Sequence, residues 1–420
     1  MKLEMVFSAP NMLRLQGVHT TRDTWKLSVD AVHTYMNSIR QRCSEKIDFS
    51  DFDISILHNA YYEPEFGFYA RKHDIFGFSK LYCDSGGLQI VSAGKAIDDE
   101  TKKTIYKNQS PSDYAFCFDE IPTRDLRKSS RADISSKVFY PENFEECAIK
   151  TAHNINEQIN SLMEMNSTAK VFYIVQGNTI KDMIDWVSHG WNIIEHPEYI
   201  AGFAVADTCM GNGLLESIDM MIVYAILSQQ YNLKRLHLLG VGSASRLLPV
   251  ITLFKRGILS DDYISFDSST LSQSFLYGRF NFNQETVSIS DESGYVNNLQ
   301  PRLKEVYEIT KHHFPDISFD DLDTHFKNTF KKITRITENT CDEPIHVYSR
   351  ALVIMLLVEQ TISLCDSIKA LYTSDSSELR MFENANSLED FIRIRNEFSK
   401  YIHSKRIHRN SNISLLDFME

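Results

Sequence analysis

The chain has 420 residues, of which 43% are hydrophobic and 24% are charged. This length and composition allow a large buried core and exclude wholesale disorder. The formal net charge of −12 at pH 7 argues against a protein held to nucleic acid by its overall charge. Two local basic segments remain, at 123–131 and 393–409, and each is either a phosphate-binding face or a solvated surface.

The sequence also indicates a compartment. It contains no run of about 18 apolar residues, and the apolar stretch at 351–360 is interrupted by Glu359, so we expect a buried helix there. Residues 1–12 lack the apolar core of a signal peptide, and we therefore expect a soluble cytoplasmic protein with no membrane partner. The seven cysteines are widely spaced without a CxC or CxxC pair, so we expect no metal site and no cofactor.

The predicted elements begin with a helix at 24–42 and continue with alternating strands and helices. Apolar, strand-like runs recur up to residue 267, at 53–59, 80–84, 114–119, 171–176, 199–206, 235–242 and 263–267. Helix-like stretches such as 144–165 and 214–231 lie between them. This alternation predicts a parallel sheet with right-handed crossovers. The strand number favours a (β/α)8 barrel with an eighth strand at 274–282, and a doubly wound open sheet is the alternative.

The pattern changes near residue 300, because only helical periodicity follows. We therefore expect three parts: a helical lead-in at 1–45, the barrel at 46–300, and a helical C-terminal domain at 301–420. The last of these contains the basic segment 393–409, so it is the candidate nucleic-acid-binding part.

Polar residues stand where the predicted strands end, and a (β/α)8 barrel carries its chemistry there. These residues are Asn59, Asp84, Asp119, Gln176, Gly202, Gly240 and Asp267. Each aspartate alone could equally cap a helix or close a turn. Together, Asp84 and Asp267 suit glycosyl transfer, in which one carboxylate attacks a sugar carbon and the other moves a proton. The two glycines after Ser85 would leave room for a flat ligand.

Asp119 and Gln176 together suit guanine. The Watson–Crick edge of guanine offers two N–H donors, and a carboxylate can accept both. Adenine presents an acceptor at the ring position, which a carboxylate would repel. Gln176 could donate to the guanine carbonyl oxygen, as could the backbone N–H of Gly202.

Six short motifs occur in the order found in the tRNA-guanine transglycosylase family. They are DSGGLQ at 84–89, FDEIP at 118–122, IVQG at 174–177, AGFAVAD at 201–207, LLGVG at 238–242 and ISFD at 264–267. ILHNAYY at 56–62 also resembles that family's early strand end, and the resemblance covers roughly residues 50–270. It implies a (β/α)8 fold and an enzyme that replaces guanine in a polynucleotide by a 7-deazaguanine without breaking the backbone.

The resemblance also implies a role for each matching residue. Asp267 matches the nucleophile and Asp84 the general acid/base. The base-binding positions are Asp119, Gln176 and Gly202, which read the base, Ser85 and Asn59, which support it, and Leu88 and Leu239, which form the walls around it.

Several positions depart from the family. Leu88 replaces an aromatic residue, Leu239 replaces a methionine of bacterial members, and Asp207 replaces a glutamate. The basic segment after the nucleophile is replaced by SSTLSQS at 268–274, and the cysteine-rich zinc module is missing, because 268–300 contains no Cys and no His. Both features help family members hold tRNA. We therefore expect DNA as the acceptor, as in phage and genomic-island relatives, and an uncharged base such as 7-cyano-7-deazaguanine as the free-base partner.

Three alternatives remain open at the sequence level. The chain could be a tRNA-guanine transglycosylase of queuosine or archaeosine type with an altered C-terminal domain. It could be a non-catalytic binding subunit, although it keeps both Asp84 and Asp267. It could also be an ordinary (β/α)8 glycosidase, although such enzymes line their clefts with aromatic platforms and this chain has only three Trp residues.

Overall fold

The computed structural model shows a closed barrel of eight parallel strands with helices around it. It describes residues 2–8, 27, 30–39, 52–62, 64, 66–73, 80–87, 97–122, 143–177, 179–205, 214–241, 247–259, 263–267, 274–275, 277–282, 285–333, 343–373 and 384–408. The barrel strands are β1 (Lys2–Ser8), β2 (Phe52–Asn59), β3 (Leu81–Asp84), β4 (Tyr114–Phe116), β5 (Lys170–Val175), β6 (Ile200–Val205), β7 (Arg235–Leu238) and β8 (Tyr263–Asp267). The predicted (β/α)8 barrel is therefore confirmed.

The barrel closes through β1, which pairs with both β2 and β8. The prediction of the eighth strand at 274–282 is wrong, because β9 (Arg279–Phe282) pairs with β10 (Glu285–Ser288) in a separate antiparallel sheet. The apolar run of β1 is broken by Glu4, which is fully buried. Glu4 accepts hydrogen bonds from Ser55 Oγ and, at 2.7 Å, from Tyr82 Oη. A charged residue that is paired inside the barrel hid this strand from its sequence pattern.

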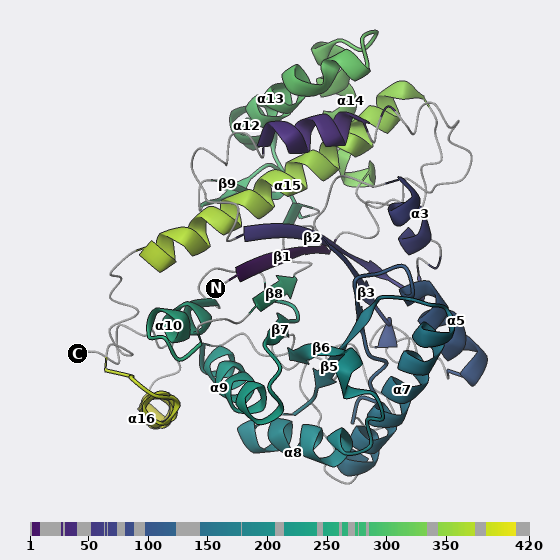
Figure 1. The fold of residues 1–420 in the computed structure, drawn as a ribbon. Helices are drawn as coiled ribbons and strands as arrows, with labels where there is room; N and C mark the ends of the chain where they lie inside the picture. The colour runs from purple at the N-terminus through teal and green to yellow at the C-terminus, as the bar shows by residue number, and fades with distance from the viewer. Residues whose placement is uncertain are drawn as a thin grey trace.

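Helices cover the outer face of the barrel (Figure 1). They are α3 (Phe66–His73), α5 (Asp99–Gln109), α7 (Phe144–Glu164), α8 (Ile180–Trp191), α9 (Leu214–Tyr231) and α10 (Leu248–Lys255). Local capping fixes where two of them begin. The side chain of Asp98 accepts from the backbone N–H of Thr101 at the start of α5, and Thr179 and Asp182 form a capping box at the start of α8.

A second group of helices packs beside β1 and β2 (Figure 1). It contains α12 (Glu292–Gly294), α13 (Gln300–Thr310), α14 (Phe319–Ile333) and α15 (Pro344–Thr373). The helical residues 30–39 share one hydrophobic core with these helices. Two long-range hydrogen bonds support this packing: Tyr35 donates to Glu359, and Thr34 Oγ1 lies 2.8 Å from His313 Nε2. Residues 30–39 of the expected lead-in therefore pack with the helices that follow residue 300, whereas Lys2–Ser8 of the same segment form barrel strand β1.

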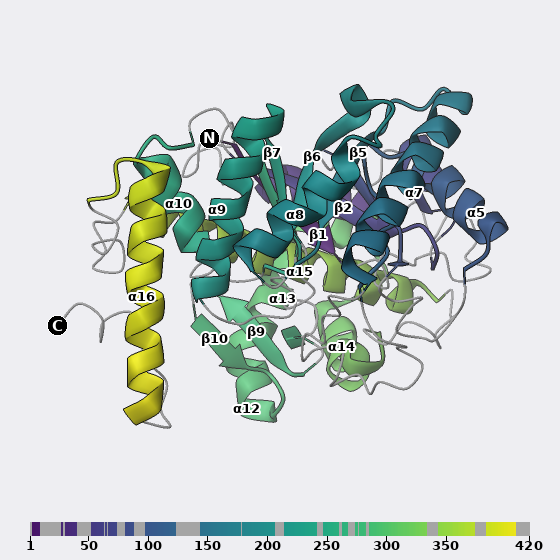
Figure 2. The ribbon, with the colours of Figure 1, turned by 90° about the horizontal axis from the view of Figure 1, so that it is seen from below.

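The last helix, α16 (Leu388–His408), packs on α9, one of the helices around the barrel. Figure 2 shows it alongside α9 and α10. Three residues of α16 are buried in a hydrophobic core that it shares with α9: Phe391, Ile394 and Phe398. In addition, Nε and Nη2 of Arg395 donate to the two carboxylate oxygens of Asp219 in α9, with Nη2–Oδ2 at 2.6 Å. Part of the basic segment 393–409 is thus used within the molecule, whereas the segment 123–131 lies outside the described residues.

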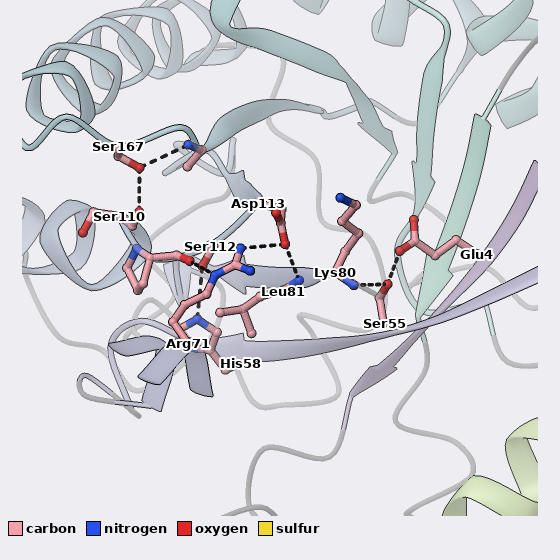
Figure 3. A network of polar contacts seen from close by, with 12 residues as sticks. Glu4, Ser55, His58, Arg71, Lys80, Leu81, Ser110, Ser112, Asp113 and Ser167 are labelled. Atoms are coloured by element: carbon pink, nitrogen blue, oxygen red, sulfur yellow. Dashed lines mark hydrogen bonds and ion pairs between the residues drawn. The ribbon is translucent and has the colours of Figure 1, made fainter. Parts of the chain in front are cut away.

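A polar network joins the amino ends of the first strands (Figure 3). Asp113, just before β4, accepts from the backbone N–H of Leu81 at 2.8 Å and pairs with Arg71 at 2.7 Å. The backbone N–H of Lys80 donates to Ser55 Oγ at 3.1 Å. These contacts set the register of β2, β3 and β4 and therefore the positions of their carboxyl ends. Across the described residues, no helix is long and apolar enough to cross a membrane.

Candidate active site

Asn59 and Asp84 end two neighbouring strands and are paired in register. Asn59 Nδ2 donates to Asp84 Oδ2 at 3.1 Å. The other amide atom, Asn59 Oδ1, accepts from the backbone N–H groups of Tyr61 and Tyr62, each at 3.0 Å. The chain after β2 therefore fixes the amide of Asn59, which in turn fixes the carboxylate of Asp84.

The turn after Asp84 requires a glycine at position 86. Gly86 has φ +79°, and a Cβ there would lie 2.8 Å from Asn59 Oδ1. At Gly87, a Cβ would lie 3.5 Å from Ser85 Oγ and 3.6 Å from Asp119 Oδ1. The turn thus brings Ser85 and the backbone after Asp84 up to the carboxylate at the end of the next strand.

Asp119 and Gln176 form a buried pair after β4 and β5. Gln176 Nε2 donates to Asp119 Oδ2 at 2.6 Å, and the two residues are 8% and 6% exposed. The segment that carries Asp119 is held by α7, because Asn154 Nδ2 donates to the carbonyl oxygen of Phe118 at 3.1 Å. Thr151 Oγ1 also accepts from the backbone N–H of Glu120 at 2.9 Å. A carboxylate and an amide are therefore held side by side at this end of the barrel.

Asp267 ends β8 and rests on the interior of the barrel. Its Oδ1 accepts from the backbone N–H of Gly240 at 3.2 Å and lies 3.1 Å from His237 Nε2. The other ring nitrogen, His237 Nδ1, lies 2.8 Å from Ser265 Oγ. Asp267 is 8% exposed, and the contacts of Oδ1 hold its carboxylate in place.

Two of the carboxyl groups have raised pKa values. The pKa of Asp84 is raised to about 6, mainly because the carboxyl group is buried. A backbone hydrogen bond from Gly86 lowers this pKa, whereas the negative charge of Asp267 raises it. Burial also raises the pKa of Asp119 to about 6 against its hydrogen bond from Gln176, and the charge of Asp84 adds to this. All three carboxyl groups stand at the carboxyl ends of parallel strands of one barrel, Asp84 at the end of β3, Asp119 after β4 and Asp267 at the end of β8.

Gly202 lies within β6 rather than at its end. It is paired with Phe172, and a Cβ there would lie 2.1 Å from the carbonyl oxygen of Arg235. Arg235 pairs with Tyr263, the first residue of β8. In strand register, Gly202 therefore lines up with the first residue of β8, whereas Asp267 is its last residue.

Of the two leucines expected to form the walls around the base, Leu239 lies among the described residues. Leu239 follows β7, is partly buried, and donates its backbone N–H to the carbonyl oxygen of Val205 at 3.3 Å. It lies beside the strand end that carries Gly240 and so borders the site. Leu88 lies outside the described residues, as does Asp207.

Sequence reasoning missed His237 and Ser265. A signal existed, because side chains alternate along a strand. Asp267 faces the barrel interior, so Ser265 must face it too, and its register partner on β7 is His237. His237 directly precedes the motif LLGVG at 238–242 and is not part of it, so the motif did not include this residue.

No group of three or more His, Cys, Asp or Glu side chains that could hold a metal ion occurs among the residues that the structure describes. The comparisons do not identify a family, since no protein-family model and no curated protein matches the chain. Asp84, Asp119 and Asp267 at the carboxyl ends of the strands are therefore the features of the chain that bear on its function.

Proposed function

We propose that this protein is a guanine transglycosylase that exchanges guanine in a polynucleotide for a 7-deazaguanine. The observation that carries the proposal is the convergence of Asp84, Asp119 and Asp267 at the carboxyl end of one barrel, with two of their pKa values raised to about 6. Enzymes that cleave glycosidic bonds require one ionised carboxylate and one that exchanges a proton in the same site.

Asp119 and Gln176 supply the recognition of the base. An ionised Asp119 accepts from the ring N–H and the exocyclic amine of guanine, and the amide nitrogen of Gln176 donates to the carbonyl oxygen. Their mutual hydrogen bond of 2.6 Å aligns the two groups before the base arrives. A 7-deazaguanine presents the same edge, so one pocket accepts both the leaving and the entering base. Reading this edge requires the target nucleotide to be turned out of its stack.

In the first half of the reaction, Asp267 attacks C1′ of the guanosine nucleotide from the face opposite the base. The C1′–N9 bond breaks, and its electron pair stays with N9. Asp84, as the protonated acid, donates its proton to the leaving guanine. A covalent glycosyl-aspartate remains, and the phosphodiester backbone is untouched.

In the second half, a free 7-deazaguanine enters the emptied pocket. The ionised Asp84 removes the proton from N9, and N9 attacks C1′. The bond between C1′ and Asp267 breaks, and the carboxylate recovers its electron pair. Two inversions give net retention at C1′.

We favour DNA as the polynucleotide. Residues 268–300 contain no Cys or His, so the zinc module with which the tRNA-acting relatives grip their substrate is absent from that segment. The basic part of α16 offers one candidate for phosphate contacts. An uncharged entering base such as 7-cyano-7-deazaguanine suits the pair of Asp119 and Gln176, which reads only the Watson–Crick edge.

A base-exchange assay tests the proposal. The purified chain is incubated with labelled guanine and either duplex DNA or tRNA, and the label in each polymer is measured. The expected result is incorporation into DNA that unlabelled 7-cyano-7-deazaguanine suppresses. Label in tRNA alone would overturn the choice of DNA. Release of guanine without exchange would identify a hydrolase, and label in neither polymer would contradict the whole proposal.

A further inference from the structure

His237 is fully buried directly beneath Asp267. Its Nε2 lies 3.1 Å from Asp267 Oδ1, and its Nδ1 lies 2.8 Å from Ser265 Oγ. An ionised carboxylate has only acceptors, so the proton on Nε2 must lie between His237 and Asp267. Nδ1 of this tautomer accepts from the hydroxyl of Ser265. The histidine is therefore a donor aimed at one oxygen of Asp267.

Aromatic rings hold this imidazole in place. The ring centroid of Phe116 lies 4.6 Å from that of His237, the centroid of Tyr82 lies at 5.7 Å, and that of Phe172 lies at 6.0 Å. All three aromatic residues are fully buried. Because a close-packed interior leaves no room for rotation of the ring, the donor is fixed before any substrate binds.

The two oxygens of Asp267 are therefore unequal. Oδ1 receives two donors, His237 Nε2 and the backbone N–H of Gly240 at 3.2 Å. None of the hydrogen bonds between described residues involves Oδ2. Because both donors bind Oδ1, Oδ2 is the oxygen whose electron pairs are available for attack.

We propose that His237 is a positioning residue that holds Oδ1 of Asp267 and presents Oδ2 as the attacking atom. The inference rests on the proposed function and adds a role in its second half. When the C1′–Oδ2 bond breaks, its electron pair returns to the carboxylate of Asp267. The two donors at Oδ1 stabilise that charge as it develops, in the manner of an oxyanion hole. Loss of His237 therefore slows the breakdown of the glycosyl-aspartate more than its formation.

A purely structural role for His237 is the competing explanation, and the chain offers a matched control. His58 is also fully buried, but it faces away from the barrel interior toward α3 and α5. Its Nε2 lies 3.3 Å from Ser112 Oγ. Replacing His58 by Leu removes a buried imidazole of the same size without touching Asp267.

The experiment uses the full chain and a guanine-containing oligonucleotide, and it measures formation of the covalent complex and its breakdown on addition of free base. His237→Leu is expected to slow breakdown by about 10- to 100-fold, the value of a hydrogen bond to a charged group, so that the complex accumulates. His237→Gln, which keeps an N–H near the place of Nε2, is expected to restore most of the rate. His58→Leu is expected to leave the ratio of the two rates unchanged.

Ser265→Ala tests the same role in case the His237→Leu variant does not fold. It keeps the imidazole but removes the hydroxyl that fixes the ring, and breakdown is expected to slow by about 2- to 10-fold. The role of His237 would be overturned if the ratio of the breakdown rate to the formation rate of the covalent complex were unchanged in Ser265→Ala and in a folded His237→Leu variant. The same conclusion would follow if His237→Gln behaved like His237→Leu. No covalent complex and no exchange in the unaltered chain would overturn the proposed function itself.

Discussion

Asp84 links the other groups of the site. It accepts from Asn59 at 3.1 Å, its charge raises the pKa of Asp119, and the charge of Asp267 raises its own. The sequence could predict that Asp84 and Asp267 share one rim, because both end parallel strands. It could not predict the environment of Asp84, which arises from burial and from residues distant in the chain.

The raised pKa of Asp84 gives opposite pH dependences for the two halves of the reaction. The first half needs the protonated acid, so its rate constant should fall as the pH rises through about 6. The second half needs the ionised base, so its rate constant should rise with pH, around a lower midpoint because the esterified Asp267 no longer carries the charge that raises the pKa of Asp84. Both rate constants are measured in single-turnover experiments at saturating polynucleotide. Under these conditions bound guanine keeps Asp119 ionised. Two rates that change in the same direction would contradict the role of Asp84.

At the scale of elements, the sequence predicted the strands that read as apolar runs, from β2 to β8. It missed β1 because of the buried Glu4, and it could not show that Gly202 lies within β6, because a motif does not reveal strand register. It also treated α16 as part of a C-terminal domain. Helical periodicity shows that a face is apolar but not which partner covers it, and here the partner is α9.

The ion pair between α16 and α9 should contribute to stability. The side chains of Arg395 and Asp219 are 22% and 11% exposed, so removing one leaves a largely buried charge. Arg395→Met is expected to lower the free energy of unfolding by about 1–3 kcal/mol. Arg393→Met is the control, because Arg393 is 55% exposed and, among the described residues, forms ion pairs only within its own helix; this variant should cost less than about 1 kcal/mol. The free energies of unfolding are measured by urea denaturation. Equal losses in Arg395→Met and Arg393→Met would contradict this prediction.

At the scale of the whole molecule, two hydrophobic cores extend across the expected boundary at residue 300. One joins residues 30–39 and the outer faces of β2 and β3 to α13, α14 and α15. The other joins α16 to the helices around β4–β8. The chain after residue 300 therefore completes the barrel's covering, beyond any role in binding a polynucleotide.

A chain truncated after residue 300 is accordingly expected not to unfold cooperatively. Removing α15 and α16 exposes apolar faces of both cores, including Ile56 and Leu81 on the barrel strands. Calorimetry of residues 1–300 beside the full chain measures this. A sharp transition of the truncated chain near that of the full chain would instead support an independent barrel.

The identity of the nucleophile is the centre of the account, and mapping the covalent adduct tests it most directly. The full chain is mixed with a guanine-containing oligonucleotide, denatured before free base is added, digested and examined by mass spectrometry. A sugar adduct on the peptide that contains Asp267, absent from the Asp267→Asn variant, is the expected result. An adduct on any other residue, or base exchange that persists in Asp267→Asn, would contradict the mechanism.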